Sequence, residues 1–424
     1  MAVESIPEFI VALGSHAILP PEQLQILADE TTATNSVSEF AKDLRQRGWL
    51  TRFQAKQVLA GNAAELNLGQ YRLLDRLGEG GMGHVYKAMH VAMSRVVALK
   101  IVRPDLVADD KTLKRFRREI QAAAQLAHPN IVTVFDASQI GDTHYLAMEF
   151  IDGVDLAERV RQSGPLPVAE ACEYLRQAAL GLQHAHDAGL IHRDIKPSNL
   201  LVAQTQTAGI VKILDLGLAR TAQIGKAKTP EQSALTLDGT VVGTPDFMAP
   251  EQAQNTGTLD HRCDLYSLGC TFYFLLAGRL PFDGGTPMEK LLQHQLEQPY
   301  PLELLRSDIP KEVMAILQRL MSKAPEDRYQ SAADLAAALR PFAAYSSDAA
   351  PSVAMSPAAE TNSRPESTFR FEPSSKNAVT ATPRREPKQA IIWILAVVGL
   401  MLIVCGGMLV ALSSQMFRAR NMLP

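Results

Sequence analysis

The chain has 424 residues, more than one ordinary hydrophobic core holds, so we expect two or more folded units joined by linkers. Its 42 basic and 45 acidic residues give a formal net charge of −3, which offers no electrostatic case for binding nucleic acid. The cysteines show no metal-ligand spacing and are typical of small apolar side chains in a reducing compartment: Cys172, Cys263, Cys270 and Cys405.

Residues 1–64 are predicted to form an N-terminal helical region. Apolar side chains recur there at helical spacing, as at Val37, Phe40 and Leu44, and Pro20-Pro21 suits the start of another helix. The sequence after Met1 lacks the basic start and apolar core of a secretory signal. Basic side chains gather toward the end of the region, and we interpret them as a solvated helix face rather than a binding patch: Lys42, Arg45, Arg47, Arg52 and Lys56.

From Tyr71 onward the pattern changes to short β-branched runs bounded by turn residues. The runs Val96–Ile101 and Ile131–Phe135 predict strands. After about Gly153 the pattern is mainly helical up to about residue 344. A β-rich lobe followed by a larger helical lobe predicts an α+β domain with two lobes over residues 71–342.

A glycine-rich segment from Leu77 to Val85 has the pattern Gly-x-Gly-x-x-Gly-x-Val, with its glycines at Gly78, Gly80 and Gly83. Glycines let the backbone approach phosphate oxygens closely. Dinucleotide-binding folds use similar glycines, but there a helix follows them directly. Residues 84–88 instead predict the second strand of a hairpin, which disfavours a dinucleotide site.

Two charged residues follow this segment in positions that suit a phosphate site. Lys100 alternates with apolar neighbours and shares a strand face with Ala98. Glu119 lies on a predicted helix and is the only acid between Lys111 and Phe135, so it is the expected ion-pair partner of Lys100.

Two further motifs place polar groups close together in sequence. The loop His192–Asn199 reads His-Arg-Asp-x-x-x-x-Asn, and Asp215 follows the apolar strand 210–214, in the triplet Asp-Leu-Gly. These residue types can supply a general base, a cation and an oxygen ligand for a metal from one loop, and a second oxygen ligand from the end of a strand.

Three other residues are predicted to support this site. Glu251, in an Ala-Pro-Glu triplet, needs a partner if it is buried, and Arg328 is the expected one. We expect Asp264 to accept hydrogen bonds from the backbone of the loop that carries Asp194.

With every motif in order, residues 71–342 resemble a eukaryotic-type (Hanks-type) serine/threonine protein kinase domain. The whole chain is similar to the membrane-anchored kinases of this family found in bacteria. The resemblance implies a two-lobed kinase fold and a transferase that uses ATP with Mg²⁺, for which Mn²⁺ can substitute. It implies transfer of the γ-phosphoryl group to Ser or Thr hydroxyls of proteins in signalling.

The same resemblance implies roles for individual residues. Asp194, Lys196 and Asn199 would be catalytic, and Asn199 with Asp215 would hold the metal. Leu216 stands where the family usually has Phe. ATP would contact residues from both lobes, with Met148 at the back of the pocket: Leu77, Gly78, Gly80, Gly83, Val85, Ala98, Lys100, Glu119, Met148, Glu149, Ile151 and Leu201.

Acceptor class and control are also implied by the resemblance. A lysine two positions after Asp194 (Lys196) and a threonine at Thr244 are features that resemble those of Ser/Thr kinases rather than Tyr kinases. Arg193 before the catalytic aspartate implies control by phosphorylation of the activation loop. We expect autophosphorylation at Thr236 and Thr240, in trans if the protein forms a homodimer.

The C-terminal part of the chain differs from the rest. Residues 345–389 are rich in Pro, Ala and Ser and predict a disordered linker. Ala390–Leu412 contains no charge and is long enough to cross a bilayer, with a short tail at 413–424. Because ATP chemistry requires the cytoplasm, we expect a single-pass protein of the cell membrane with a cytoplasmic kinase domain.

Two other functions remain as alternatives. A pseudokinase scaffold would bind ATP without transfer, and the presence of Lys100, Glu119, Asp194, Asn199 and Asp215 disfavours it. A small-molecule kinase of related fold is disfavoured by the Ala-Pro-Glu triplet and the long segment before it.

Overall fold

The computed structural model describes residues 3–29, 36–81, 83–106, 110–203, 209–216, 245–253 and 259–343. All of them belong to one compact unit, Met1–Ala350, and the second unit is Pro351–Pro424. The predicted linker, membrane helix and tail lie outside the described residues, as do Thr236, Thr240 and Thr244. In the part that the structure describes, no helix is both long and apolar enough to span a membrane.

The N-terminal region consists of the helices α1 (Ile6–Ser15), α2 (Pro21–Asp29), α3 (Val37–Gln46) and α4 (Arg52–Leu59). The Thr51 hydroxyl and the Gln54 amide form a reciprocal cap at the start of α4. The apolar faces of the helices pack together around Phe9, Leu13 and Leu44, none of which is exposed. The periodicity seen in the sequence therefore marks a buried face.

An antiparallel sheet follows, with the strand order β1-β2-β3-β4-β6-β5 among the described residues. Its strands are β1 (Asn67–Leu68), β2 (Tyr71–Gly80), β3 (Gly83–His90), β4 (Arg95–Val102), β5 (Val134–Ile140) and β6 (Thr143–Glu149). Helix α5 (Asp110–Ala124) packs beside β5. The β2–β3 pairing confirms the predicted hairpin at the glycine-rich segment.

One strand boundary differs from the prediction. The strand expected from Ile131 begins at Val134. The residues just before it pair elsewhere: the Val132 N–H donates to the Ile213 carbonyl, and the Ile213 N–H donates to the Asn130 carbonyl. This segment therefore connects the sheet to a strand of the second lobe, because its backbone groups need partners and find them there.

The two faces of the sheet pack against different partners. On β4, Val97 and Leu99 face the core that the N-terminal helices share, while Ala98 lies on the opposite side with the cluster around α5. Strand β6 alternates in the same way, with Ala147 on the first face and Leu146 on the second. The strand period of two thus gives one face to the N-terminal helices and the other to the cluster around α5.

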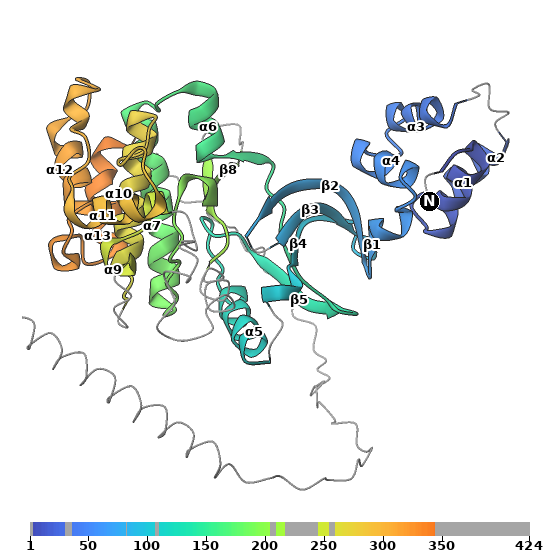
Figure 1. Cartoon of the computed structure of the whole chain (residues 1–424), viewed down its shortest axis with the longest axis horizontal. Coiled ribbons are helices and arrows are strands. Elements are labelled where there is room, and N and C mark those ends of the chain that lie inside the picture. Colours follow the sequence, from blue (N-terminus) through green and yellow to red (C-terminus); the bar gives the residue numbers. More distant parts are fainter. Residues whose placement is uncertain are drawn as a thin grey trace, which may run out of the picture. The chain divides into compact units, whose positions relative to one another are not determined.

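The second lobe is mainly helical (Figure 1). A small sheet holds β7 (Gly153–Asp155), β8 (Leu200–Ala203) and β9 (Ile210–Ile213). The helices are α6 (Leu156–Ser163), α7 (Val168–Asp187), α9 (Pro250–Ala253), α10 (Arg262–Ala277), α11 (Pro287–Leu296), α12 (Lys311–Leu320) and α13 (Ala332–Leu339). Helix α10 is buried along nearly its whole length and forms the centre of this lobe.

Shortening one buried side chain tests whether the N-terminal helices and the sheet share a core. Leu44→Ala should lower the free energy of unfolding by about 2–5 kcal/mol, because it removes fully buried methyl groups and leaves a cavity. Lys42→Ala on the exposed face of α3 should change it by less than about 0.5 kcal/mol. Urea denaturation measures both. Amide hydrogen exchange in β2–β4 should speed up in Leu44→Ala, and unchanged exchange there would contradict a shared core.

Candidate active site

The glycine-rich hairpin carries the predicted residues from Leu77 to Val85 on β2 and β3. Gly80 lies opposite Gly83, whose φ is +146° and where an added Cβ would meet the Ile101 carbonyl oxygen at 1.8 Å. Gly83 is therefore required by the fold itself. At Gly78 and Gly80 an added Cβ would have no atom within 4 Å. The folded chain alone does not explain those two glycines, whereas a ligand lying against the backbone would.

Lys100 and Asp215 form an ion pair between the two lobes. The Lys100 Nζ donates to Asp215 Oδ1 at 2.7 Å, and the lysine side chain is only 6% exposed. Burial by itself would raise the pKa of Asp215, but the charge and hydrogen bond of Lys100 outweigh it and lower that pKa. Asp215 has a positive φ of 58°, an unusual conformation for a non-glycine residue. Its carboxylate is thus held ionised in a strained position.

The loop that carries Asp194 lies next to Asp215. Lys196 Nζ donates to Asp194 Oδ2 at 2.8 Å, and Asn199 Nδ2 donates to the same oxygen at 3.0 Å and to the Asp194 carbonyl at 2.7 Å. Because the Asn199 amide nitrogen is used in this way, its Oδ1 is the atom left to bind a cation. The Leu214 N–H donates to the Asn199 carbonyl at 2.9 Å, which brings the loop next to Asp215.

The buried carboxylate of Asp264 holds the backbone of this loop. Asp264 has no exposed surface, and it accepts the N–H groups of His192 at 2.8 Å and Arg193 at 2.7 Å, which confirms the predicted contact. A ring nitrogen of His186 lies 2.9 Å from it. Burial would raise the pKa of Asp264, but the hydrogen bond to His186 and the other contacts lower it. The bonds also stabilise the positive φ of 68° at Arg193.

The predicted base-binding residues lie where the two lobes join. Ala98 on β4 lies opposite Met148 on β6, Leu201 lies on β8, and Ile151 follows β6. The carboxylate of Glu149 is held by Lys212 on β9, at 2.8 and 3.1 Å, and by the Thr133 N–H at 3.3 Å.

Sequence reasoning missed Lys212. A lysine between two apolar residues of the strand that leads to Asp215 was the available signal. Through this ion pair, β9, which leads to Asp215, is tied to the segment that would bind the base.

Helix α5 carries Glu119, which is half-buried there, and its pairing with Lys100 stays a prediction. Leu216 and Asp215 line a small cavity together with Ile120 and Ala123 of α5. Leu216 also belongs to the core of the helical lobe and is 6% exposed. A leucine at this position therefore still connects Asp215 to α5 and to the second lobe.

Comparison with known proteins identifies this arrangement. Residues 71–338 match the family described as protein kinase domain. The chain belongs to the protein kinase family. The serine/threonine-protein kinase PknB of Mycobacterium leprae is 38% identical over 274 residues, covering 64% of this chain and 42% of that protein. The kinase pkn2 of Myxococcus xanthus is 39% identical over 273 residues, covering 64% and 32%.

A solved structure with the same fold is the kinase domain of Mycobacterium tuberculosis PknI. It superimposes with a TM-score of 0.51 at 28% identity, over 65% of this chain and 98% of that one. This chain spans about two fifths or less of the length of the two curated relatives named above. The N-terminal helices lie outside the matched kinase domain.

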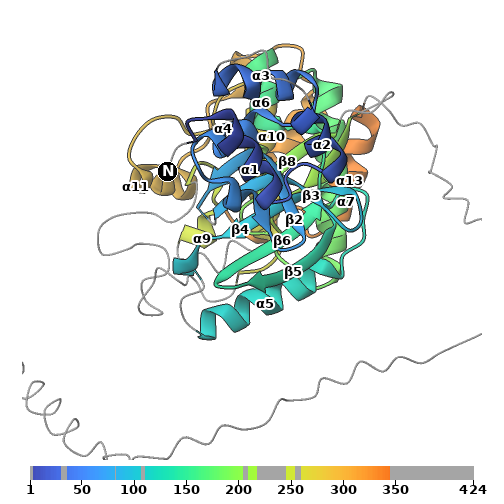
Figure 2. The same ribbon diagram turned by 90° about the vertical axis from the view of Figure 1, so that its right-hand side faces the viewer.

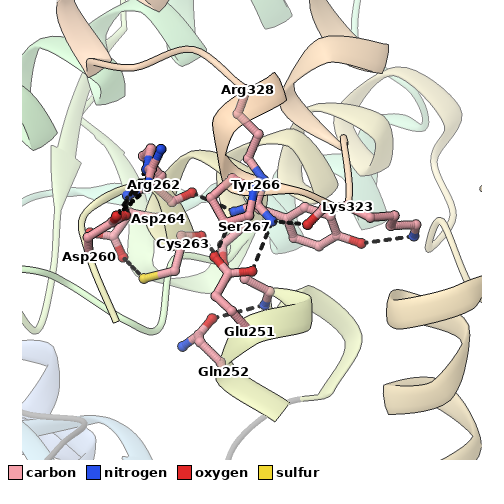
Figure 3. A network of polar contacts seen from close by, with 12 residues as sticks. Glu251, Gln252, Asp260, Arg262, Cys263, Asp264, Tyr266, Ser267, Lys323 and Arg328 are labelled. Carbon is pink, nitrogen blue, oxygen red and sulfur yellow. Dashed lines mark hydrogen bonds and ion pairs between the residues drawn. The ribbon is translucent and has the colours of Figure 1, made fainter. Parts of the chain in front are cut away.

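In this kinase domain, Glu251 and Arg328 form the predicted ion pair (Figure 3). Arg328 has no exposed surface and donates to the two carboxylate oxygens of Glu251 at 2.7 and 2.9 Å. Its other N–H groups donate to the carbonyls of Ser322, Arg262 and Lys323. All five guanidinium donors are therefore used. The pair fixes α9 against the helical lobe and is structural.

Removing one partner of this buried pair should be costly. Arg328→Met should lower the free energy of unfolding by about 3–5 kcal/mol, because the Glu251 carboxylate and three backbone carbonyls lose their donors. Arg161→Met is a matched control, since the Arg161 side chain is 75% exposed, and should cost less than about 1 kcal/mol. Chemical denaturation distinguishes the two, and equal losses would contradict the structural role of Arg328.

Proposed function

We propose that the protein is an ATP-dependent serine/threonine protein kinase that transfers the γ-phosphoryl group of ATP to hydroxyls of protein substrates. The observation that carries this proposal is a pair of adjoining polar clusters. Lys196 and Asn199 donate hydrogen bonds to Asp194, and Lys100 donates one to Asp215. The backbone bond between Leu214 and Asn199 joins the two clusters. Its relatives are named serine/threonine-protein kinases, which supports the same acceptor class. A pseudokinase would not need all of these groups, and nothing in their geometry favours one.

The phosphoryl-transfer step follows from these positions. Asp194 would orient the substrate hydroxyl and accept its proton as the oxygen attacks the γ-phosphorus and the bond to the β-phosphate oxygen breaks. Lys196, which lies 2.8 Å from Asp194 Oδ2, would neutralise charge that develops on the transferred group. The products are ADP and a phosphoester.

Binding of MgATP would use residues of both lobes. Asn199 and Asp215 would hold Mg²⁺, which neutralises charge on the β- and γ-phosphates, and Mn²⁺ can substitute for it. Both side chains offer hard oxygen ligands, and the lowered pKa of Asp215 keeps its carboxylate ionised. Lys100 would contact the α- and β-phosphates. Because Gly78 and Gly80 have no side chain, their backbone could approach the phosphates closely. Backbone groups of Glu149 and Ile151 would bind the base.

Replacing the proposed base tests the reaction. Asp194→Asn should lower turnover by roughly 10²–10⁴-fold because the proton acceptor is lost, while MgATP still binds. Asp187→Asn, an exposed carboxylate at the end of α7, should leave the rate unchanged. Phosphate incorporation into a generic protein substrate and calorimetric binding of MgATP measure the two effects. If Asp194→Asn keeps its rate, the base is wrongly assigned, and if the wild type binds MgATP without transfer, it is a pseudokinase.

The same pair of proteins addresses regulation, for which we propose autophosphorylation at Thr236 and Thr240. Mass spectrometry after incubation with ATP should find phosphate on these threonines in the wild type and not in Asp194→Asn. Mixing Asp194→Asn with the wild type should restore the phosphate on the variant if the reaction runs in trans between two copies. Phosphate found only at other positions would contradict the two sites.

For localisation we propose a single-pass membrane protein with its kinase domain in the cytoplasm, anchored by Ala390–Leu412. The absence of charge in this segment supports the proposal. Deleting 390–412 should move the protein from the membrane pellet to the soluble fraction of a cell lysate. Deleting 350–372, a segment of equal length in the predicted linker, should leave it in the pellet. A soluble full-length protein would contradict the anchor.

A further inference from the structure

We infer that the N-terminal helical region positions the glycine-rich hairpin, and that Thr51, the N-cap of α4, and Gln54 in its first turn are the positioning residues. The inference rests on the proposed function, because the hairpin acts by covering bound ATP. It gives residues before the kinase domain a role in catalysis, although the family match begins only at residue 71.

Both side chains form hydrogen bonds with the backbone of β2. The Thr51 hydroxyl donates to the Leu74 carbonyl, and Gln54 Nε2 donates to the Leu73 carbonyl at 2.9 Å. The same two side chains cap α4: the Gln54 N–H donates to Thr51 Oγ1, and the Thr51 N–H donates to Gln54 Oε1. Gln54 is 3% exposed, so its amide depends on these partners. The start of α4 and the backbone of β2 are therefore one rigid joint.

This joint lies at an irregularity in the strand. Leu73 pairs with Ala88 and Asp75 pairs with Lys87, so Leu74 is an extra residue with no partner on β3. Such a bulge bends a strand and increases its twist, which sets the direction of everything after it. A second register shift follows between Arg76 and Gly78, so the strand changes its pairing once more before the first glycine. Side chains that hold the two carbonyls at the first bulge therefore fix the segment from which the hairpin starts.

Helix α4 also contacts the second strand of the hairpin. The ring of Phe53 packs against Tyr86 on β3, with ring centroids 5.9 Å apart. Tyr86 lies opposite Arg76, the residue after the bulged segment. Both ribbon views place α4 beside the β2–β3 hairpin (Figures 1 and 2). The helix thus contacts both strands at the base of the hairpin.

The tip of the hairpin has few constraints of its own. Leu77 is 48% exposed, and an added Cβ at Gly78, Gly80 or Gly81 would meet no atom within 4 Å. The polar contacts described there join Arg76 to Glu79 and His84, all within the hairpin. The orientation of the tip over the cleft is therefore set at its base, where α4 holds it.

Loosening the base should weaken nucleotide binding more than it slows chemistry. A hairpin that is free to move must be ordered when the nucleotide binds, and this ordering reduces affinity. The carboxylates and lysines that carry out the transfer lie elsewhere, so turnover at saturating ATP should change little. A purely structural role would instead lower thermal stability and leave the KM for ATP unchanged.

The test uses the full chain with Thr51→Val and Gln54→Leu, which keep side-chain volume and remove the hydrogen bonds to β2. Each should raise the KM for ATP and the Kd for MgADP by about three- to tenfold, the effect of one hydrogen bond, with kcat within about twofold of the wild type. Thr51→Ser keeps the hydroxyl and should restore wild-type values. Lys56→Gln, on the exposed face of α4, should have no effect.

All measurements are made below the unfolding temperature of each variant, and Thr51→Val alone decides if Gln54→Leu does not fold. Unchanged KM and Kd in folded Thr51→Val would overturn the inference, as would equal effects of Thr51→Val and Thr51→Ser. Calorimetric binding of MgADP needs no phosphoryl transfer. An inactive wild type would therefore count against the proposed kinase activity while the Kd values still decide the role of α4.

Discussion

The structure depends on burial of both faces of the first sheet. Strand β4 turns Val97 and Leu99 toward the N-terminal helices and Ala98 and Lys100 toward the cleft. If one face were bare, Tyr71, Leu73 and Tyr145 would meet water. With that face covered by α1–α4, the strand that carries Lys100 is held from behind, and its short ion pair with Asp215 can join the two lobes.

Buried charges are the second constraint, and each has its partners. Asp264 accepts two N–H groups of the loop it supports, and Arg328 uses all five of its donors. Neither side chain is exposed to water, so each would be costly without these bonds. The result is a rigid helical lobe that holds Asp194 and Asn199 in place. By contrast, the glycine-rich hairpin is exposed and held mainly at its base, which suits a part of the site that must admit and release a nucleotide.

Much of the fold and site could be read from sequence, because the signals are local. Three segments can each be recognised from a few consecutive residues: the alternation around Lys100, the apolar strand before Asp215 and the loop from His192 to Asn199. The partners predicted for Glu251 and Asp264 were also correct, since a buried charge limits the choice of partner strongly. The strand expected from Ile131 was wrong at its start, because its β-branched residues fit a strand while its backbone pairs with the other lobe.

The sequence by itself determined the types of reactive group, their order along the chain and the family to which they belong. Only the tertiary structure decided that Lys212 holds Glu149, and that Thr51 and Gln54 hold the carbonyls of β2. The physical reason is that every residue has the same backbone carbonyl, so no residue type marks which one a distant donor will find. That choice is made when the helices dock on the sheet and the buried donors must be satisfied.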